Sequence, residues 1–508
     1  MSELKKTGAF VLVALVLCGA AFVRLPDRSR RDQSFKDQGL PFFPEFKDPT
    51  VCTDLEVVDY DPGTAATSRF QVKLKDGKWV IPSHYDYPAD AKDRLAKTAS
   101  GVIDLNKDTI RSDLAEDHAT LGVIDPLDEK STELKGRGKR VTLRDKTENT
   151  LADFIIGNEV RDRPEQHYVR VPGQKRTYGV NVKVELSTKF ADWIETNLLK
   201  LDAGRIRRVI FRHDKVDPDR GSVVRGETFE IDREASSGPW KLEGGVPAGE
   251  ELSNEKLQAL SSALADLKIV GVRPKPAGLT RDLKTAEGIK LTQQALLSLN
   301  SRGFYPTRDG RLLSNQGDVS VATDEGVVYT LRFGEVVFAT GEDLSRGDDS
   351  PGAAKSTEKA KDDKKKDGAS ESRYLMVTVG FDPALLPPAH PAEKPPVGPL
   401  VIPDDPFQKA PDDPARIAEE KAAKEKFDRE EAEHARRIAD GEKRVKELTD
   451  RFADWYYVTP GESFRSISLE RKELLKAKVD PANQDPNAPP PALPGLNVPG
   501  LPGLPDAH

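Results

Sequence analysis

A four-residue sequence that occurs twice does most to constrain the fold of this chain. The tetrapeptide Phe-Ala-Asp-Trp occupies residues 190–193 and again residues 452–455, in a chain with only four tryptophans. The other two tryptophans also match, because Trp79 and Trp240 each end an alternating, strand-like run that precedes a helix-like run. We therefore interpret the chain as one fold used twice.

The composition excludes some functional classes. The net charge of −7 is spread over 508 residues, whereas a nucleic-acid binder needs a concentrated basic face. The two cysteines are Cys18, in the apolar N-terminal run, and Cys52. With one cysteine outside that run, the chain offers neither an intrachain disulfide framework nor a cysteine-based metal site.

The N-terminus carries an apolar run over residues 8–23. At about 1.5 Å per residue this run is shorter than the roughly 30 Å hydrocarbon core, unless Leu25 and a snorkelling Arg24 extend it. It fits an uncleaved signal-anchor, a cleaved signal peptide or a lipoprotein signal that ends at Cys18. The last is disfavoured by Leu17, because a small residue normally precedes a lipidated cysteine. We expect a signal-anchor helix over residues 1–24, with 8–25 in the membrane.

The charges beside this run bear on orientation. More arginines follow the run than lysines precede it, so the positive-inside rule would place the C-terminal side in the cytoplasm. Long domains translocate largely regardless of charge. We therefore expect a single-pass protein of the inner (cytoplasmic) membrane with most of the chain extracytoplasmic.

Two similar units follow a polar, proline-containing tether at residues 25–50. We place the first at 51–204 and the second at 205–475, each with alternating strands of an antiparallel meander and a helix. The expected fold class is α+β, a tandem duplication of an antiparallel sheet-plus-helix unit. In this alignment Gly157 matches Gly334 and Tyr168 matches Tyr374. Trp79 is expected over Trp240, and Trp193 over Trp455. Both tetrapeptide tryptophans are expected to be buried, and a helix running to about residue 199 is expected to start at residue 190.

The second unit is the longer one because it contains insertions. Residues 341–372 are lysine-rich with a disordered composition, and 383–415 are proline-rich and extended. A charged helix is expected over 416–451. Its last turns should pack on the sheet, while its N-terminal part is solvated or meets a partner, because polar residues interrupt its apolar seam. Residues 476–508 form a proline-rich, disordered tail.

No established catalytic motif is present. The sequence lacks a phosphate-binding loop, a dinucleotide glycine fingerprint, a zinc-protease motif and a hydrolase nucleophile elbow. Residues 84–87 (His-Tyr-Asp-Tyr) are the densest functional-looking group, which we interpret as a turn whose aromatic rings cover a helix start. Asp192 and Asp454 could form an acid pair, but first-turn helix charges explain them better. We predict no catalytic, cofactor-binding or metal-ligating residue, and tryptophans that anchor the core.

These segments together resemble a known family. The residues that carry the resemblance are Trp79 with Pro88-Ala89-Asp90, Leu121-Gly122-Val123 with Asp125-Pro126, Ile155-Ile156-Gly157, and both tetrapeptides, the second continuing into Tyr456-Tyr457-Val458. Over roughly residues 50–475 the chain is similar to bacterial membrane-anchored proteins called domain of unknown function forty-three forty. The resemblance implies an extracytoplasmic accessory protein, often encoded beside auxiliary and permease subunits of gliding-motility-type ABC exporters. It implies no catalytic residues, and the insertions and the tail depart from the plainest members.

Three functional hypotheses follow. The leading one is a non-enzymatic, membrane-anchored accessory of an ABC-type transport complex, with a permease or auxiliary subunit as partner. The second is an envelope scaffold or protein-binding module unrelated to transport. The third is a hydrolase with dispersed catalytic residues, which a deep pocket holding a histidine beside carboxylates would favour.

Overall fold

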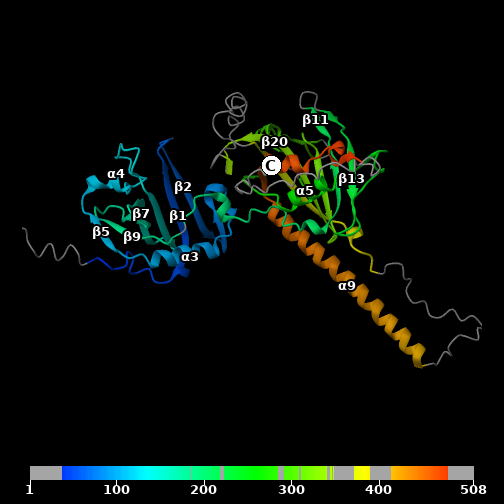
Figure 1. Ribbon diagram of the computed structural model, residues 1–508, viewed down its shortest axis with the longest axis horizontal. Coiled ribbons are helices and arrows are strands. Elements are labelled where there is room, and N and C mark those ends of the chain that lie inside the picture. The colour runs from blue at the N-terminus through cyan, green and yellow to red at the C-terminus, as the bar shows by residue number, and fades with distance from the viewer. Residues whose placement is uncertain are drawn as a thin grey trace, which may run out of the picture.

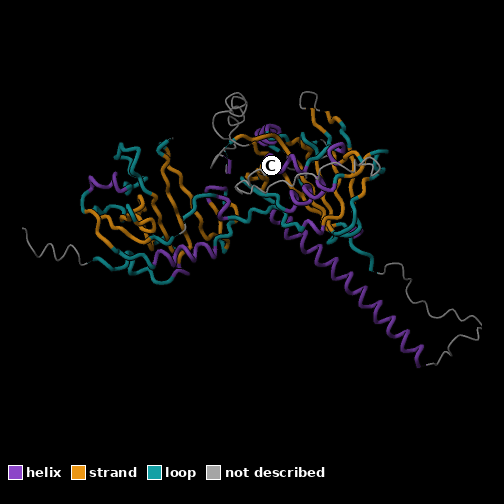
Figure 2. The backbone as a smooth tube through the Cα atoms, viewed as in Figure 1, coloured by secondary structure: helices purple, strands orange, loops and turns teal. Residues whose placement is uncertain are grey.

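The protein is a mixed α+β structure built on two large antiparallel sheets (Figures 1 and 2). This computed structural model describes residues 37–478 except 64, 185, 218–221, 284–290, 308–310, 340–343, 346, 348–370 and 390–413. The predicted α+β class with antiparallel sheets is confirmed. The expected membrane segment lies outside the described residues, among which no helix is both long and apolar enough to cross a bilayer.

The first sheet has the strand order β4-β3-β2-β1-β6-β7-β8-β9-β5. Its strands are β1 (Cys52–Asp61), β2 (Ala66–Lys75), β3 (Lys78–Ile81), β4 (Tyr87–Pro88), β5 (Thr109–Ser112), β6 (Lys139–Asp145), β7 (Thr150–Val160), β8 (Arg163–Arg170) and β9 (Thr177–Asn181). Alternation along β1 and β2 sends Leu55, Val57 and Phe70 into the core. Each of these strands therefore has one face that must be covered.

The helix α3 (Lys92–Ile103) contributes to that cover. Leu95, Ala99 and Val102 are buried and lie within the same apolar cluster as the sheet residues. The helix begins after Ala91, so the preceding Asp90, a residue type that often caps helices, is not its N-cap. Instead the backbone N–H of Asp90 donates to the carbonyl oxygen of Trp193 at 2.8 Å.

The second sheet has the order β14-β13-β10-β19-β20-β21-β22-β16. Its strands are β10 (Ile206–Arg212), β13 (Thr228–Asp232), β14 (Lys241–Leu242), β16 (Gly271–Pro274), β19 (Asp318–Thr323), β20 (Val327–Phe338), β21 (Glu371–Phe381) and β22 (Trp455–Pro460). The helix α5 (Asn254–Ala265) buries Leu257, Leu260 and Leu264. Ser253 is its N-cap, since the Ser253 side chain accepts from the N–H of Lys256.

The remaining elements are short, apart from one long helix. They are α4 (His118–Leu121), α6 (Gln293–Ser301), α9 (Pro414–Phe452), α10 (Gly461–Ile467), the ribbon strands β11 (Lys215–Asp217) and β12 (Ser222–Val224), β15 (Glu250–Leu252) and β23 (Leu475–Ala477), β17 (Phe304–Pro306) and β18 (Leu312–Ser314), and the 3₁₀ turns η1 (Pro49–Val51), η2 (Pro82–His84), η3 (Ala115–Asp117), η4 (Phe190–Trp193), η5 (Ala203–Arg205), η6 (Pro383–Leu385) and η7 (Arg471–Leu474). The helix α9 projects away from the second sheet (Figure 1).

The two sheets share a strand register as well as a strand order. Tracing the cross-strand pairs outward from Val57 and from Phe211 brings matching residues to matching places. The matched pairs include Trp79 with Trp240, Gly157 with Gly334, Tyr168 with Tyr374, and Tyr178 with Tyr457. Because a one-residue slip turns every side chain to the other face, a shared register puts equivalent positions on the core side of both sheets.

The expected equivalence of Trp193 and Trp455 is wrong. Trp455 opens β22, which occupies the place that β9 has in the first sheet. Trp193 instead ends η4, well after β9. The expected helix from residue 190 is also wrong, because the backbone is extended from Ile194. Trp193 is fully buried, whereas Trp455 is only half-buried.

The expected insertion at 341–372 overlaps ordered structure. Residues 371 and 372 open β21, and Ser345 is buried. The charged helix expected at 416–451 is found as α9, from Pro414 to Phe452. One apolar cluster includes buried residues from both sheets and from the end of α9, so the sheets share a core.

Candidate functional site

The turn at residues 84–87 lies where the two sheets meet. Pro82 starts η2 and fixes its geometry, and the turn then leads into β4. His84 is only 2% exposed and stacks on Phe190, with ring centroids 4.2 Å apart and an interplanar angle of 4°. The group that the sequence singled out therefore contacts the first tetrapeptide.

His84 lies between two serine hydroxyls. Its Nε2 is 2.9 Å from Ser345 Oγ and its Nδ1 is 2.9 Å from Ser83 Oγ. A serine beside a histidine is also the arrangement of a nucleophile and its base. Here Ser345 is 7% exposed, and the group on Nδ1 is a hydroxyl in place of the carboxylate that orients a catalytic imidazole. The geometry fits a buried polar contact between the two sheet units.

Tyr85 and Asp86 continue the turn in an uncommon conformation. Both have φ of 60°, in the left-handed region that non-glycine residues rarely adopt. The Tyr85 hydroxyl donates to the carbonyl oxygen of Gly347 at 2.8 Å, and Lys75 Nζ lies 2.6 Å from Asp86 Oδ2. Such conformations persist where surrounding contacts hold them.

Tyr87 brings the second tetrapeptide to the same place. Its ring meets Trp455 edge-on at 5.1 Å and Phe190 at 5.7 Å. Burial raises the pKa of Tyr87 and raises the pKa of Tyr457 well above its ordinary value, so both phenols stay neutral. The two tetrapeptides therefore converge on one junction, although they occupy different places in their sheets.

On the side of the second sheet, a buried arginine holds the backbone of the segment that contains Ser345. Arg273, in β16, donates from Nη1 to the carbonyl oxygen of Ser345 at 3.1 Å and from Nη2 to that of Leu344 at 3.2 Å. A Cβ atom on Gly271 would lie 2.3 Å from the Leu344 carbonyl oxygen, so this segment crosses β16 at a point where only glycine fits. Backbone carbonyls compensate the burial of the guanidinium.

The connection between the sheets is packed on both sides. The N–H of Leu198 donates to Leu267 at 2.8 Å, beyond the end of α5, and Arg451 Nη2 donates to the Asn197 carbonyl oxygen at 2.8 Å from α9. Leu198 and Leu199 are fully buried. The segment is therefore clamped between α9 and the chain that follows α5.

The helix α9 divides into two parts. We call residues 414–440 the arm and residues 441–452 the root. No side chain described between 417 and 440 is buried, whereas Gly441, Leu448 and Phe452 in the root are buried. At about 1.5 Å per residue the arm extends for roughly 40 Å.

A cavity of about 340 Å³ lies where the arm meets the root. It is lined by Arg205, Asp324, Glu325, Leu386, Pro387, Arg437, Asp440, Gly441 and Arg444. The charges are mixed and largely paired: Arg205 pairs with Glu325, Asp324 with Arg207 and Arg437 with Glu433. Its size suits a small ligand, but three arginines facing three acids favour neither an anion nor a cation.

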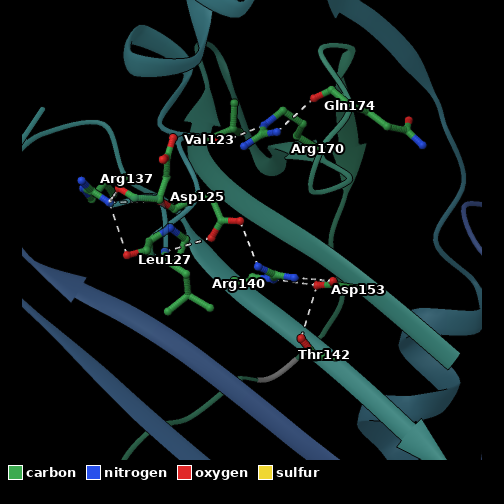
Figure 3. Close-up of polar contacts among 11 residues, drawn as sticks. Val123, Asp125, Leu127, Arg137, Arg140, Thr142, Asp153, Arg170 and Gln174 are labelled. Carbon is green, nitrogen blue, oxygen red and sulfur yellow. Dashed lines mark hydrogen bonds and ion pairs between the residues drawn. The ribbon is translucent and has the colours of Figure 1, made fainter. Parts of the chain in front are cut away.

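A second polar network lies on the first sheet and braces the turn at Asp125-Pro126 (Figure 3). Arg140 bridges Asp125 at 2.9 Å and Asp153 at 2.6 Å. Arg170 donates to the carbonyl oxygens of Val123 and Gln174, and burial lowers its pKa. These contacts hold the 121–138 connection against the sheet.

The expected acid pair is not supported by local contacts. Asp192 accepts a hydrogen bond from Ser187 Oγ at 2.5 Å, and exposed Asp454 is placed by a backbone bond from Lys275. Within the residues that the structure describes, no group of three or more histidine, cysteine, aspartate or glutamate side chains could hold a metal ion.

Sequence reasoning missed Ser345, Arg273 and Arg451. Ser345 sits in a stretch whose composition reads as disordered, and the other two read as ordinary charged residues of a strand and a helix. Gly271 next to an arginine in a strand is the signal that could have pointed to a close backbone approach.

Comparison with known protein families gives a match over part of the chain. Residues 79–282 match a family described as "Domain of unknown function (DUF4340)". The match begins at the Trp79 strand, passes through the junction turn and ends beyond β16. Neither a curated protein nor a solved structure matches the chain.

Proposed function

From the DUF4340 domain that this chain contains over residues 79–282, we propose a non-enzymatic accessory protein of an ABC-type transport complex, anchored in the cytoplasmic membrane. The family resemblance suggests the setting, beside a permease or auxiliary subunit. Residues 8–25 would hold the chain in the membrane, with the bulk outside the cytoplasm.

The observation that carries this proposal is the exposed arm of α9. A helix this long gains little from burial along its arm, so its stability comes from the packed root and from pairs along its surface. Lys426 lies 3.8 Å from Glu430, and Arg437 lies 2.7 Å from Glu433. Such pairs contribute about 0.2–0.5 kcal/mol each. A rigid, solvent-facing helix held by a buried root is suited to reach a partner.

The junction supports a scaffold in preference to a hydrolase. Its histidine, serine and arginine are buried and bonded to one another, so they position the units and leave no reacting group at a surface. Catalysis needs convergent groups that a substrate can reach.

We also infer that the two sheet units, 51–204 and 205–475, arose by internal duplication. The shared strand order and register support this, since unrelated sheets have no reason to place the same glycine and tyrosine positions alike. The second unit then acquired α9 between β21 and β22.

The test is affinity purification from detergent-solubilised membranes with mass spectrometry of what co-purifies. The full-length protein is compared with a variant whose residues 414–437 are replaced by a Gly-Ser linker of equal length. The replacement stops short of the buried root, so both sheets keep their core. We expect a permease or nucleotide-binding subunit with the full-length protein and a strong loss with the linker variant.

Point variants sharpen the comparison. Ile417→Ala with Phe427→Ala changes apolar side chains on the arm, and Leu297→Ala changes an exposed leucine on α6 as the matched control. Only the arm pair should reduce recovery. Recovery of no transport subunit by the intact protein would sink the transport proposal and favour an envelope scaffold.

A further inference from the structure

We propose that Leu344, Ser345 and Gly347 form a clasp that fixes the orientation of the two sheet units, so that the arm is carried on a rigid body. The clasp belongs to the connection between β20 and β21 in the second unit. It holds the 84–87 turn of the first unit.

The clasp packs against β16 of its own unit, at positions where an arginine and two glycines are required. Arg273 donates to the carbonyl oxygens of Ser345 and Leu344. Gly271 leaves room for the crossing backbone. A Cβ atom on Gly347 would lie 2.1 Å from Arg273 Nη2, so this glycine too is packed against the guanidinium.

The clasp reaches the first unit through side-chain and backbone atoms. Ser345 Oγ lies 2.9 Å from His84 Nε2, and the Gly347 carbonyl oxygen accepts from the Tyr85 hydroxyl at 2.8 Å. His84 cannot swing freely, because Phe190 stacks on its ring. The left-handed backbone at Tyr85 and Asp86 shapes the turn, and the Tyr85 hydroxyl is the group that reaches the clasp.

The orientation of the units is then fixed at two places. One is the α9 root, where Arg451 Nη2 donates to the Asn197 carbonyl oxygen of the connection. The other is the clasp. If the two units were joined only at the α9 root, they could rotate relative to each other about that point. A second contact at the clasp restricts this rotation. Without the clasp, the first unit would keep its apolar contacts with the second unit but would sample a wider range of orientations about the connection at 194–202.

The test compares two variants of the full-length protein, each with a different part of the β20–β21 connection replaced. One variant replaces residues 344–347 with Ser-Gly-Ser-Gly, which removes the Ser345 hydroxyl, and its matched control replaces 348–370 with a Gly-Ser stretch of equal length. Spin labels at Leu114→Cys and Leu297→Cys, both exposed, report the distance between the units in a Cys18→Ser, Cys52→Ala background. Amide hydrogen exchange at residues 83–87 reports on the turn itself.

We expect the clasp replacement to widen the distance distribution about twofold or more and to raise exchange in the turn about tenfold. The control replacement should change neither. If the clasp replacement fails to fold, the Ser345→Ala, Tyr85→Phe double variant, which keeps the backbone, decides the question. Equal distributions and exchange in the clasp variants and the control would overturn the proposal.

Discussion

Trp193 and Trp455 have different surroundings despite their shared tetrapeptide. Trp193 has no exposed surface, packs beside Phe70 and donates from Nε1 to the Ser187 carbonyl oxygen at 2.9 Å. Trp455 is half-buried against Tyr87. Trp193→Ala should therefore cost about 3–5 kcal/mol of unfolding free energy, and Trp455→Ala about 1–2 kcal/mol. Urea unfolding followed by circular dichroism measures both, and equal costs would contradict the burial argument.

Lys275 gives a pH-dependent prediction. Its Nζ donates to the Phe452 carbonyl oxygen at 2.8 Å, and burial lowers its pKa from 10.5 to about 8. Between pH 8 and 10.5 the unfolded chain holds a proton that the folded protein has released, so this group's contribution to stability rises with pH across that window. Below pH 8 the folded protein bears the full cost of a buried charge.

Lys275→Met should remove that cost. We expect a gain of the order of 1–3 kcal/mol at pH 7 that shrinks as the pH rises toward 10. The exposed Lys268→Met is the control and should change stability little at either pH. Thermal unfolding at pH 7 and pH 9.5 makes the comparison. A pH-independent difference between Lys275→Met and the wild type would contradict the assigned cause.

Gly441 decides where α9 can rest on the sheet. A Cβ atom there would lie 2.4 Å from Phe381 Cε2 and 2.7 Å from the Glu325 carbonyl oxygen. Gly441→Ala should destabilise the protein by about 1–3 kcal/mol through overpacking, although alanine favours a helix. Gly380→Ala, with open space at its Cβ, is the control. If differential scanning calorimetry finds Gly441→Ala as stable as the control, the close approach of helix and sheet is wrong.

At the level of helices and strands, sequence patterns predicted some features of the fold and missed others. Alternation and spacing placed the meander strands, the two helices after the tryptophan strands, and the matches of Gly157 with Gly334 and Tyr168 with Tyr374. Those matches follow from local periodicity, which the strands obey. The tetrapeptides misled because four identical residues carry no register, and Phe452 ends a helix while Phe190 begins a 3₁₀ turn.

Sequence analysis identified only one half of the candidate site. The 84–87 turn is dense enough to notice in the sequence, whereas its partner Ser345 lies 261 positions away in a stretch of disordered composition. A contact between distant residues leaves no periodic signal on either side. The clasp could therefore be recognised only from the folded arrangement.

The molecule as a whole should unfold in one step. One apolar cluster runs through both sheets, and the connection between them is packed on both sides, so neither unit has a complete core of its own. We expect calorimetric and van't Hoff enthalpies to agree over the main transition. Two resolved transitions, one for each sheet, would show that the units are independent and that the shared cluster contributes little.

Membrane orientation is testable at this level too. We fuse two kinds of reporter at position 200, one active only outside the cytoplasm and one active only inside it. We expect activity from the extracytoplasmic reporter alone. Position 200 lies in the connection between the units, so a fusion there reports on the first unit after translocation. Activity of a cytoplasmic reporter alone would reverse the proposed topology and agree with the arginine count beside the apolar run.

The packing of residues 194–202 bears on the order in which the chain can mature. The first unit is synthesised early. Its contacts from Tyr87 to Trp455 and from Asn197 to Arg451 can form only when almost the whole chain has been made. Until then the apolar edge of that unit faces solvent, in a state prone to association with other chains. A nascent chain stopped after β21 but before residue 451 would carry a complete first sheet and a second sheet that lacks β22, without the late contacts that join the two units. Cellular quality control would therefore have a single late event to monitor.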